Sequence, residues 1–401
     1  MSTPHPDSED ENSVLNDFIS TIDTDQLLHA ASKLRPGVEN RLGERFLGGY
    51  NVLFEILFSD GLIWLARCPL PYHCSSQDAA DYLLQSYAST LRYIKLHTTI
   101  PVPTVYDCRR KSEDGNNIGA SYLLMERLPG HPIDMQDVYK WHEGYPQARA
   151  SAKKVFDQLC HYIMQLASVQ FDGIGSLQER PMGSGNFVLD EYLDAGITFP
   201  PERGRIYESS TARGPFNTTS EYYSAMLSLN DQYAMIEQDE DYILALQHCR
   251  LLEPLLTLTE FDKGPFVINH DDLSSSNILI DDEYNITGII DFPGTTTTLS
   301  SLCVYPSIFQ ENCASPFTDR GLWLECMLNA RPVHGSTLND PEVRKLLMDG
   351  ALDRGTFDSV LRYIHAYISV PYLARKYGIV PKLANISPET TVTSQDDAGG
   401  A

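Results

Sequence analysis

Apolar and polar positions in the first third of the chain predict a β-hairpin. Two apolar runs rich in β-branched and aromatic residues, 52–58 and 62–66, form the stretch "VLFEILFSDGLIWLA". The residues between them, Ser59-Asp60-Gly61, are typical of a tight turn. We therefore predict two paired strands, and a further strand within "SYLLMERLPG" at 121–130.

A helical period follows the hairpin. Apolar residues that recur at helical spacing are Leu83, Tyr87, Leu91 and Ile94. Ser75 or Ser76 is suited to cap the start of this helix. The prolines of "IPVP", at 100–103, end it, because proline cannot continue a helix and restricts the residue before it.

The pattern changes again near Pro129-Gly130. Beyond this point long segments have helical periodicity, such as "VFDQLCHYIMQLASVQF", in which Phe156, Leu159, Ile163 and Leu166 share one face. The change predicts a domain boundary, because it separates a strand-rich segment from a mostly helical one.

The predicted organisation is an α+β fold in two lobes. A small lobe with an antiparallel sheet covers 40–128, and a larger, mainly helical lobe covers 129–385. Residues 1–20 are acidic, and 387–401 are polar with small side chains, so both ends are predicted to be disordered tails.

Charge and composition narrow the class of partner. The 401 residues carry a formal net charge of −24, which argues against nucleic acid or an anionic membrane, because both are bound by clustered Lys and Arg. A cationic or neutral small substrate fits better. With no signal peptide, no long apolar span and eight cysteines without C-x-x-C spacing, we expect a cytoplasmic protein with reduced thiols.

One segment of the large lobe carries an unusual acidic pair. "VINHDDLSSSNILIDD" places Asp271 and Asp272 between predicted strands at 266–268 and 278–280, with another strand at 286–290. Since desolvating two adjacent carboxylates is costly, the pair is expected on a loop at the inner edge of the lobe. Loops on a rigid scaffold commonly carry catalytic residues.

The spacing around this pair resembles a known family. His270, Asp272 and Asn277 follow the pattern H-x-D-x-x-x-x-N, and "GIIDF" brings Asp291 to the end of the next strand. This set is similar to the H-G-D-L-x-x-x-N-I-L loop and I-I-D-W element of the aminoglycoside phosphotransferase family. The resemblance implies a bilobal, protein-kinase-like fold and spans roughly residues 40 to 375. Asp271 replaces the family's glycine and is expected to face solvent without a role.

The resemblance also implies roles for these residues. Asp272 would orient the acceptor hydroxyl and accept its proton, while Asn277 and Asp291 would hold Mg²⁺ against the phosphates of ATP. His270 would brace the loop through hydrogen bonds. The implied reaction is phosphorylation of a hydroxyl group on a small molecule.

The small lobe supplies candidate nucleotide contacts. Gly48, Gly49 and Asn51 in "FLGGYNVLFEILF" correspond to the family's nucleotide loop, where glycine lets backbone N–H groups approach phosphates. Arg67 ends the second hairpin strand, where related kinases place a lysine that contacts phosphates. A turn for the glycines and a solvated strand end for Arg67 are the alternative interpretations.

One departure concerns the partner of Arg67. The family's helix carries a Glu that pairs with the basic residue, and Tyr87 stands in its place. Either Gln85 or the Tyr87 hydroxyl orients Arg67 by a neutral hydrogen bond, or Tyr87 is a core residue.

Two further segments complete the candidate sites. "YLLMERLPGHPI" resembles the family's hinge, which implies Met125 behind the adenine and the backbones of Glu126 and Leu128 as partners of the base. The acidic run "EQDEDY" at 237–242 is either a solvated helix face or a contact for an amino substrate.

Three functions remain open from the sequence. The leading one is an ATP- and Mg-dependent small-molecule kinase. The alternative is a nucleotide-binding protein without activity, which loss of the helix Glu favours and intact Asp272, Asn277 and Asp291 disfavour. A kinase acting on proteins is less favoured, because no A-P-E motif follows "DFPG".

Overall fold

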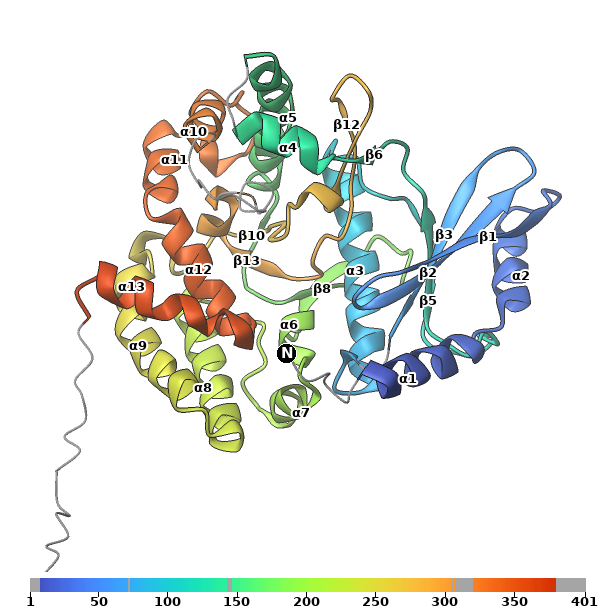
Figure 1. Ribbon diagram of the computed structural model, residues 1–401, viewed down its shortest axis with the longest axis horizontal. Coiled ribbons are helices and arrows are strands. Elements are labelled where there is room, and N and C mark those ends of the chain that lie inside the picture. Colours follow the sequence, from blue (N-terminus) through green and yellow to red (C-terminus); the bar gives the residue numbers. More distant parts are fainter. Residues whose placement is uncertain (1–7, 71–72, 143–145, 305, 307–319, 380–401) are drawn as a thin grey trace, which may run out of the picture.

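A computed structural model gives the fold, and it describes residues 8–70, 73–142, 146–304, 306 and 320–379. A twisted sheet lies on one side of the molecule and most helices lie on the other, with helix α3 between them (Figure 1). We call the sheet with α1 and α2 the small lobe, and the elements from β6 onward the large lobe.

The small lobe is built on five antiparallel strands in the order β1-β2-β3-β5-β4. The predicted hairpin forms its centre, with Leu53 opposite Arg67 and Ile56 opposite Trp64. The strands are β1 (Asn40–Leu47), β2 (Asn51–Phe58), β3 (Ile63–Pro69), β4 (Val105–Arg109) and β5 (Tyr122–Glu126).

Helices α1 (Ser8–Ser20) and α2 (Thr24–Leu34) precede the sheet. The prediction of a disordered tail over 1–20 is therefore wrong for Ser8–Ser20. The reason is that Leu15, Phe18 and Ile19 pack against the core of the small lobe, which offsets the entropy cost of ordering an acidic segment. The other predicted tail, 387–401, lies outside the described residues.

Helix α3 (Gln77–His97) connects the two lobes. It begins at the predicted cap, where the Ser76 hydroxyl accepts a hydrogen bond from the Ala79 N–H at 3.0 Å. On the large-lobe side, Arg92 Nε lies 2.6 Å from the buried Glu179 carboxylate, and Ser89 Oγ accepts from the Glu179 N–H at 2.9 Å. The helix is thus bonded to the large lobe while it also packs on the sheet.

The large lobe combines helices with short strands. The helices of eight residues or more are α4 (Met135–His142), α5 (Pro146–Leu166), α7 (Pro201–Ser209), α8 (Thr219–Glu237), α9 (Glu240–Leu256), α10 (Arg320–Leu328), α11 (Pro341–Met348) and α12 (Ala351–Arg362). The shorter helices are α6 (Ala195–Thr198) and α13 (Val370–Lys376).

The strands of the large lobe are short. They are β6 (His131–Pro132), β7 (Gln170–Phe171), β8 (Ser176–Glu179), β9 (Phe187–Asp190), β10 (Phe266–Ile268), β11 (Ile278–Ile280), β12 (Ile286–Ile289) and β13 (Thr296–Thr298). The sheet of the small lobe ends at Glu126, and β6 already pairs with β11 of the large lobe. The change of architecture therefore falls between these two elements, close to the predicted change at Pro129-Gly130.

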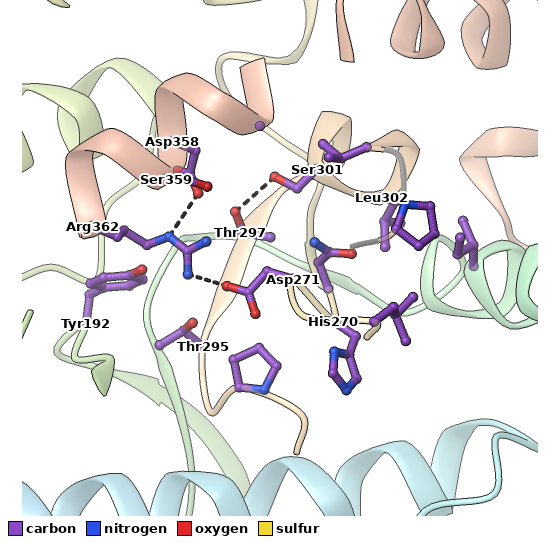
Figure 2. Close-up of a pocket in the computed structure, with 17 residues that line it drawn as sticks. Tyr192, His270, Asp271, Thr295, Thr297, Ser301, Leu302, Asp358, Ser359 and Arg362 are labelled. Carbon is purple, nitrogen blue, oxygen red and sulfur yellow. Dashed lines mark hydrogen bonds and ion pairs between the residues drawn. The ribbon is translucent and has the colours of Figure 1, made fainter. Parts of the chain in front are cut away.

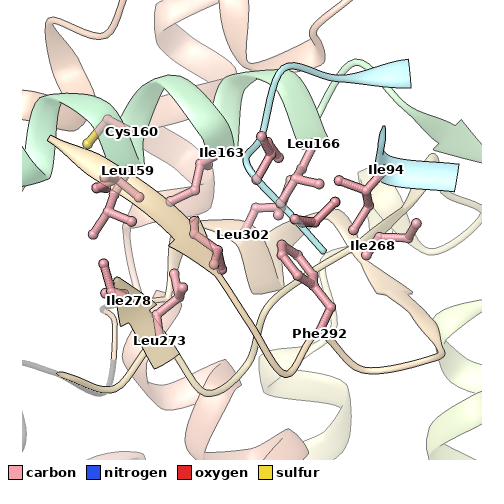
Figure 3. Close-up of a cluster of buried hydrophobic side chains, with 14 of the residues drawn as sticks. Ile94, Leu159, Cys160, Ile163, Leu166, Ile268, Leu273, Ile278, Phe292 and Leu302 are labelled. Carbon is pink, nitrogen blue, oxygen red and sulfur yellow. The ribbon is translucent and has the colours of Figure 1, made fainter. Parts of the chain in front are cut away.

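The core of the large lobe lies directly behind the predicted catalytic loop. Side chains of α3, α5, β10, β11 and the segment after β12 meet there, as Figure 3 shows. The predicted apolar face of α5 is confirmed, because Phe156, Leu159, Ile163 and Leu166 are all buried in this cluster. The loop that bears Asp272 therefore stands on a packed apolar base.

Two further expectations can be compared with the structure. The cysteines that it describes are free thiols and most are buried, as predicted. Within the described ranges, none of the helices combines the length and apolar character needed to cross a lipid bilayer.

Candidate active site

The residues singled out by the H-x-D-x-x-x-x-N spacing lie on one continuous segment between β10 and β11. After β10, a loop carries His270 and Asp272, a short 3₁₀ helix (Ser275–Asn277) follows, and β11 leads through a hairpin to β12. Because Ile278 pairs with Ile289, the hairpin returns the chain to Asn277 just before Asp291.

Both backbone groups of Ile290 hold this arrangement together. Its N–H donates to the carbonyl of Asn277 at 3.1 Å, and its carbonyl lies 2.7 Å from His270 Nε2. His270 Nδ1 accepts the N–H of Asp272 at 3.3 Å, so Nε2 carries the proton of a neutral imidazole and donates to Ile290. This geometry supports the bracing role expected for His270.

The side chain of Asn277 is hydrogen-bonded to Asp272. Its side-chain amide nitrogen donates to the carbonyl of Asp272 at 2.9 Å and to its carboxylate at 3.0 Å. Asn277 is buried, so these bonds fix its orientation. The amide oxygen takes part in neither bond, and an oxygen is the atom through which an amide binds a hard cation.

Asp291 forms an ion pair with Arg67 of β3 across the cleft between the lobes. Arg67 Nη1 lies 2.5 Å from Asp291 Oδ1, and the Arg67 guanidinium lies 4.3 Å from the centre of the Tyr87 ring. The charge of Arg67 holds the pKa of Asp291 below its ordinary value. Asp291 therefore stays ionised, and its second carboxylate oxygen is not used by the ion pair.

The backbone of Asp291 is also unusual. Its φ is +63°, a left-handed conformation that residues other than glycine adopt rarely and that Asn and Asp tolerate best. This turn after β12 directs the chain toward Gly294, whose carbonyl accepts the Ser86 hydroxyl of α3 at 2.6 Å. Local strain at a position of this kind is common in functional sites.

Asp271 is an exposed residue, as expected, but its side chain has a partner that was not expected. Its side chain is only 25% exposed and is ion-paired with Arg362 at the end of α12. Figure 2 shows Arg362 directed at Asp271 on one side and at Asp358, 3.0 Å away, on the other. Desolvation opposes ionisation of Asp271, but the Arg362 charge outweighs it and leaves the pKa of Asp271 lowered.

A buried acidic cluster surrounds Arg362. Asp194 Oδ2 lies 3.8 Å from Arg362 Nη1 and accepts the Tyr192 hydroxyl at 2.5 Å. Burial raises the pKa of Asp358. Arg362, Asp194 and Asp358 were not among the predicted site residues. Arg362 and Asp358 belong to α12 and Asp194 caps α6, and no spacing relates these elements to the loop.

A cleft between the sheet, α3 and the loop is lined by four of the predicted site residues, and His270, Asn277, the two glycines and the hinge residues are not part of its lining. Its lining residues with functional side chains include Asn51, Arg67, Tyr87, Asp194, Asp271, Asp272, Asp291 and Arg362. Asn51 and Arg67 are thus brought to the same cleft as Asp272 and Asp291. Gly48 and Gly49 form the turn between β1 and β2, where the Gly48 N–H donates to the Asn51 carbonyl at 2.9 Å.

The predicted hinge has its expected strand but one backbone group is already bonded. Met125 is buried in the core that includes α3 and β5. The Glu126 N–H donates to the Thr104 carbonyl at 2.9 Å, so this donor is not free for a base. Of the backbone groups that the resemblance implies as partners of the base, the Glu126 carbonyl and those of Leu128 are therefore the ones to consider.

The acidic run at 237–242 forms the connection between α8 and α9. Asp239 caps α9, because its carboxylate accepts the N–H groups of Asp241 and Tyr242. The run does not line the cleft that holds Asp272. The structure therefore favours the solvated helix terminus over the contact with an amino substrate.

The donor set fits Mg²⁺ in part. Asn277 and Asp291 supply hard oxygens from positions joined through Ile290. Among the residues that the structure describes, no group of three or more His, Cys, Asp or Glu side chains is arranged to hold a metal alone. The remaining ligands would be phosphate oxygens and water, which is the coordination that Mg²⁺ prefers at nucleotide sites.

Comparison with known proteins identifies the class. The sequence model described as "Phosphotransferase enzyme family" matches residues 80–299, which is more than half of the chain. The chain therefore belongs to the phosphotransferase enzyme family. Its architecture is the predicted α+β fold in two lobes, with a small antiparallel sheet and a larger, mainly helical lobe.

Individual relatives are distant. The clavilactone A biosynthesis cluster protein Y of Ampulloclitocybe clavipes is 26% identical over 253 residues, which are 60% of this chain and 57% of that protein. A subtelomeric hrmA-associated cluster protein of Aspergillus fumigatus is 24% identical over 293 residues, 62% of this chain and 56% of that protein. The chain thus spans little more than half the length of the curated relatives that it matches.

Among solved structures, the macrolide 2'-phosphotransferase MphH of Brachybacterium faecium is 15% identical with a TM-score of 0.42, covering 88% of this chain and 97% of that one.

Proposed function

We propose that this protein transfers the γ-phosphoryl group of ATP to a hydroxyl of a small molecule with the help of Mg²⁺. The observation that carries the proposal is the network through Ile290, which joins His270, Asn277 and Asp272 and ends beside Asp291. A chance motif on a solvated loop would have no reason to share the backbone groups of one residue.

Mg²⁺ and ATP, when bound, supply the phosphoryl group and neutralise the charge that develops on it. Asp272 orients the acceptor hydroxyl and accepts its proton. Asn277 holds Asp272 through its amide nitrogen and keeps its oxygen for the cation, while Asp291 supplies a second oxygen. Asn51 and Arg67 line the cleft from the small lobe and would contact the phosphates there.

The acceptor would enter the same cleft beside Asp272. The cleft contains the carboxylates Asp194, Asp271, Asp272 and Asp291 but only two arginines, so its formal charge is negative. We propose a neutral or cationic acceptor, because an anionic one would meet repulsion there.

A thermal-shift experiment tests nucleotide and metal binding. Mg-ATP is expected to raise the melting temperature, as any ligand that binds only the folded state does. Asp291→Asn should abolish the part of the shift that depends on Mg²⁺. Asparagine is preferred to alanine here because it tolerates the left-handed backbone of residue 291. Absence of stabilisation by any nucleotide would contradict the proposal.

A second experiment tests catalysis. The purified protein is incubated with γ-labelled ATP and a broad panel of hydroxylated metabolites, and labelled products are separated. Asp272→Asn should reduce product formation by about 10²- to 10⁴-fold while ATP binding persists. Asp282→Asn is the control, because its side chain is 96% exposed in the turn after β11. If the native protein and Asp272→Asn are equally inactive while both bind ATP, the non-catalytic alternative is supported instead.

A further inference from the structure

Arg67 has two partners of different kinds. One nitrogen of its guanidinium contacts Asp291, and the guanidinium carbon lies over the Tyr87 ring, 4.3 Å from its centre. The Tyr87 hydroxyl is also hydrogen-bonded to Arg67. The Arg67 side chain is 16% exposed and Tyr87 is buried, so the contact between these two is made with little competition from water, whereas the Asp291 side chain is 48% exposed.

Tyr87 does not supply a negative charge to offset the positive charge of Arg67. Burial raises the pKa of the Tyr87 phenol to about 12, so this side chain is neutral near physiological pH. A carboxylate at this position would neutralise Arg67. Asp291 therefore carries the compensating negative charge in the absence of ligand.

The contact with the ring does not depend on one particular N–H group of Arg67. The attraction of a cation to the face of an aromatic ring is electrostatic, and a guanidinium has five N–H donors. Tyr87 can therefore hold Arg67 in place while the N–H group that contacts Asp291 changes partner. A Glu at residue 87 would instead pair with those donors directly.

We propose that Tyr87 is a positioning residue that holds Arg67 by cation–π stacking, and that Arg67 exchanges Asp291 for the phosphates of the nucleotide when Asp291 binds Mg²⁺. This inference rests on the proposed function. It assigns Arg67 two alternating partners, one within the protein and one in the ligand, with Tyr87 as the constant contact.

A role in packing alone has different consequences. Tyr87 also belongs to the core cluster that contains Leu84 and Leu91 of the same helix. If it served only to fill that core, leucine would be a tolerable replacement and any loss would affect all ligands alike. A test must therefore distinguish a specific loss of affinity for the phosphates from a general loss of affinity caused by a disturbed cleft.

Calorimetric titration of Tyr87→Phe and Tyr87→Leu with Mg-ATP and with adenosine makes this separation. Phenylalanine keeps the ring and removes the hydroxyl that is bonded to Arg67, and because the ring makes the main contact, affinity for Mg-ATP should stay within about two-fold. Leucine removes the ring and should weaken Mg-ATP by about 5- to 30-fold while adenosine, which has no phosphates, binds as before.

A double variant provides the matched control. Arg67→Ala should weaken Mg-ATP, and adding Tyr87→Leu should cause little further loss, because the stack acts only through Arg67. Additive losses, or equal losses for adenosine and Mg-ATP, would show that Tyr87 is a core residue and would overturn the inference. If the native protein binds neither ligand, the proposed function itself fails.

The exchange of Asp291 for phosphate by Arg67 has its own test. One variant should change the affinity for ATP in opposite directions with and without Mg²⁺. Asp291→Asn frees Arg67 from its ion pair, so ATP in the presence of EDTA should bind more tightly than to the native protein. The same variant should bind Mg-ATP more weakly, because it lacks the carboxylate for the cation. A variant that weakens both forms equally would rule out the exchange.

Discussion

At the scale of single residues, the ion pair of Asp271 with Arg362 fastens the catalytic loop to α12. The two residues are 91 positions apart in sequence, and Arg362 is also bonded to Asp358. Removing one partner of such a pair leaves the other charge desolvated without compensation. The pair therefore has a structural purpose next to the proposed catalytic Asp272.

Asp271→Asn is expected to lower the free energy of unfolding by about 1–3 kcal/mol near neutral pH, with Asp358 limiting the loss. The pKa of Asp271 is lower in the folded protein than in the unfolded chain, where it is about 3.9. The stabilisation is therefore complete above about pH 4 and disappears as the pH falls through the folded value. Urea titrations of both proteins at several pH values measure this difference.

The control for this experiment is Asp282→Asn, whose side chain is 96% exposed. Its effect should be small at every pH. A stability difference for Asp271→Asn that stays constant down to about pH 2 would contradict the ion-pair explanation.

Residues whose roles depend on local spacing could be predicted from the sequence. His270, Asp272, Asn277 and Asp291 could be grouped from their spacing, and the structure brings them together because a loop and one hairpin join them. Arg362 could not be predicted, since only the packing of α12 brings it to the loop. The stack of Tyr87 on Arg67 also depends on how α3 lies against β3.

At the scale of elements, α3 approaches the segment after β12 very closely. A Cβ atom added to Gly294 would lie 2.3 Å from the Ser86 hydroxyl oxygen and 2.7 Å from its Cβ. The glycine therefore allows the helix and the segment that follows Asp291 to touch.

Gly294→Ala is expected to destabilise the protein by about 1–3 kcal/mol, because the added methyl group must displace Ser86. Ser86→Gly alone should cost about 1 kcal/mol for a glycine within a helix, together with the lost hydrogen bond. In the double variant the clash with the Ser86 side chain is absent. The double variant should therefore be destabilised by less than the sum of the two separate losses. Strictly additive values from denaturant titration would argue against this contact.

Elements with a regular pattern were predicted well, and those without one were missed. The hairpin of β2 and β3 has continuous apolar runs, and its turn falls where expected. Strand β1 was missed, because its residues are mostly exposed and polar and a bulge between Leu42 and Arg45 breaks its register. Helix α1 was missed, because its acidic composition concealed Leu15, Phe18 and Ile19.

At the scale of the whole molecule, charge opposes the arrival of a nucleotide. The formal net charge is −24, and the cleft has an excess of carboxylates over arginines. Attraction by Arg67 acts only at short range, whereas the field of the whole protein acts over about 10 Å or more at low salt. An anionic ligand must therefore approach against repulsion.

The association rate of Mg-free ATP is expected to increase about two- to five-fold between about 20 mM and about 200 mM KCl, because salt screens the repulsion. Adenosine should show no such dependence, and Mg-ATP should show a smaller one. Stopped-flow measurements with a fluorescent nucleotide would detect the change. A rate that decreases with salt would mean that the local field at the cleft is positive.

Helix α3 carries bonds to both walls of the cleft. Ser86 donates to Gly294 in the large lobe, and Lys95 Nζ lies 3.2 Å from the Glu126 carboxylate of β5 in the sheet. Tyr87 lies on the helix between these two attachments, so a movement of either lobe relative to α3 strains one of the bonds. Any rocking of the lobes would therefore change the distance between Tyr87 and the arginine that it contacts on β3.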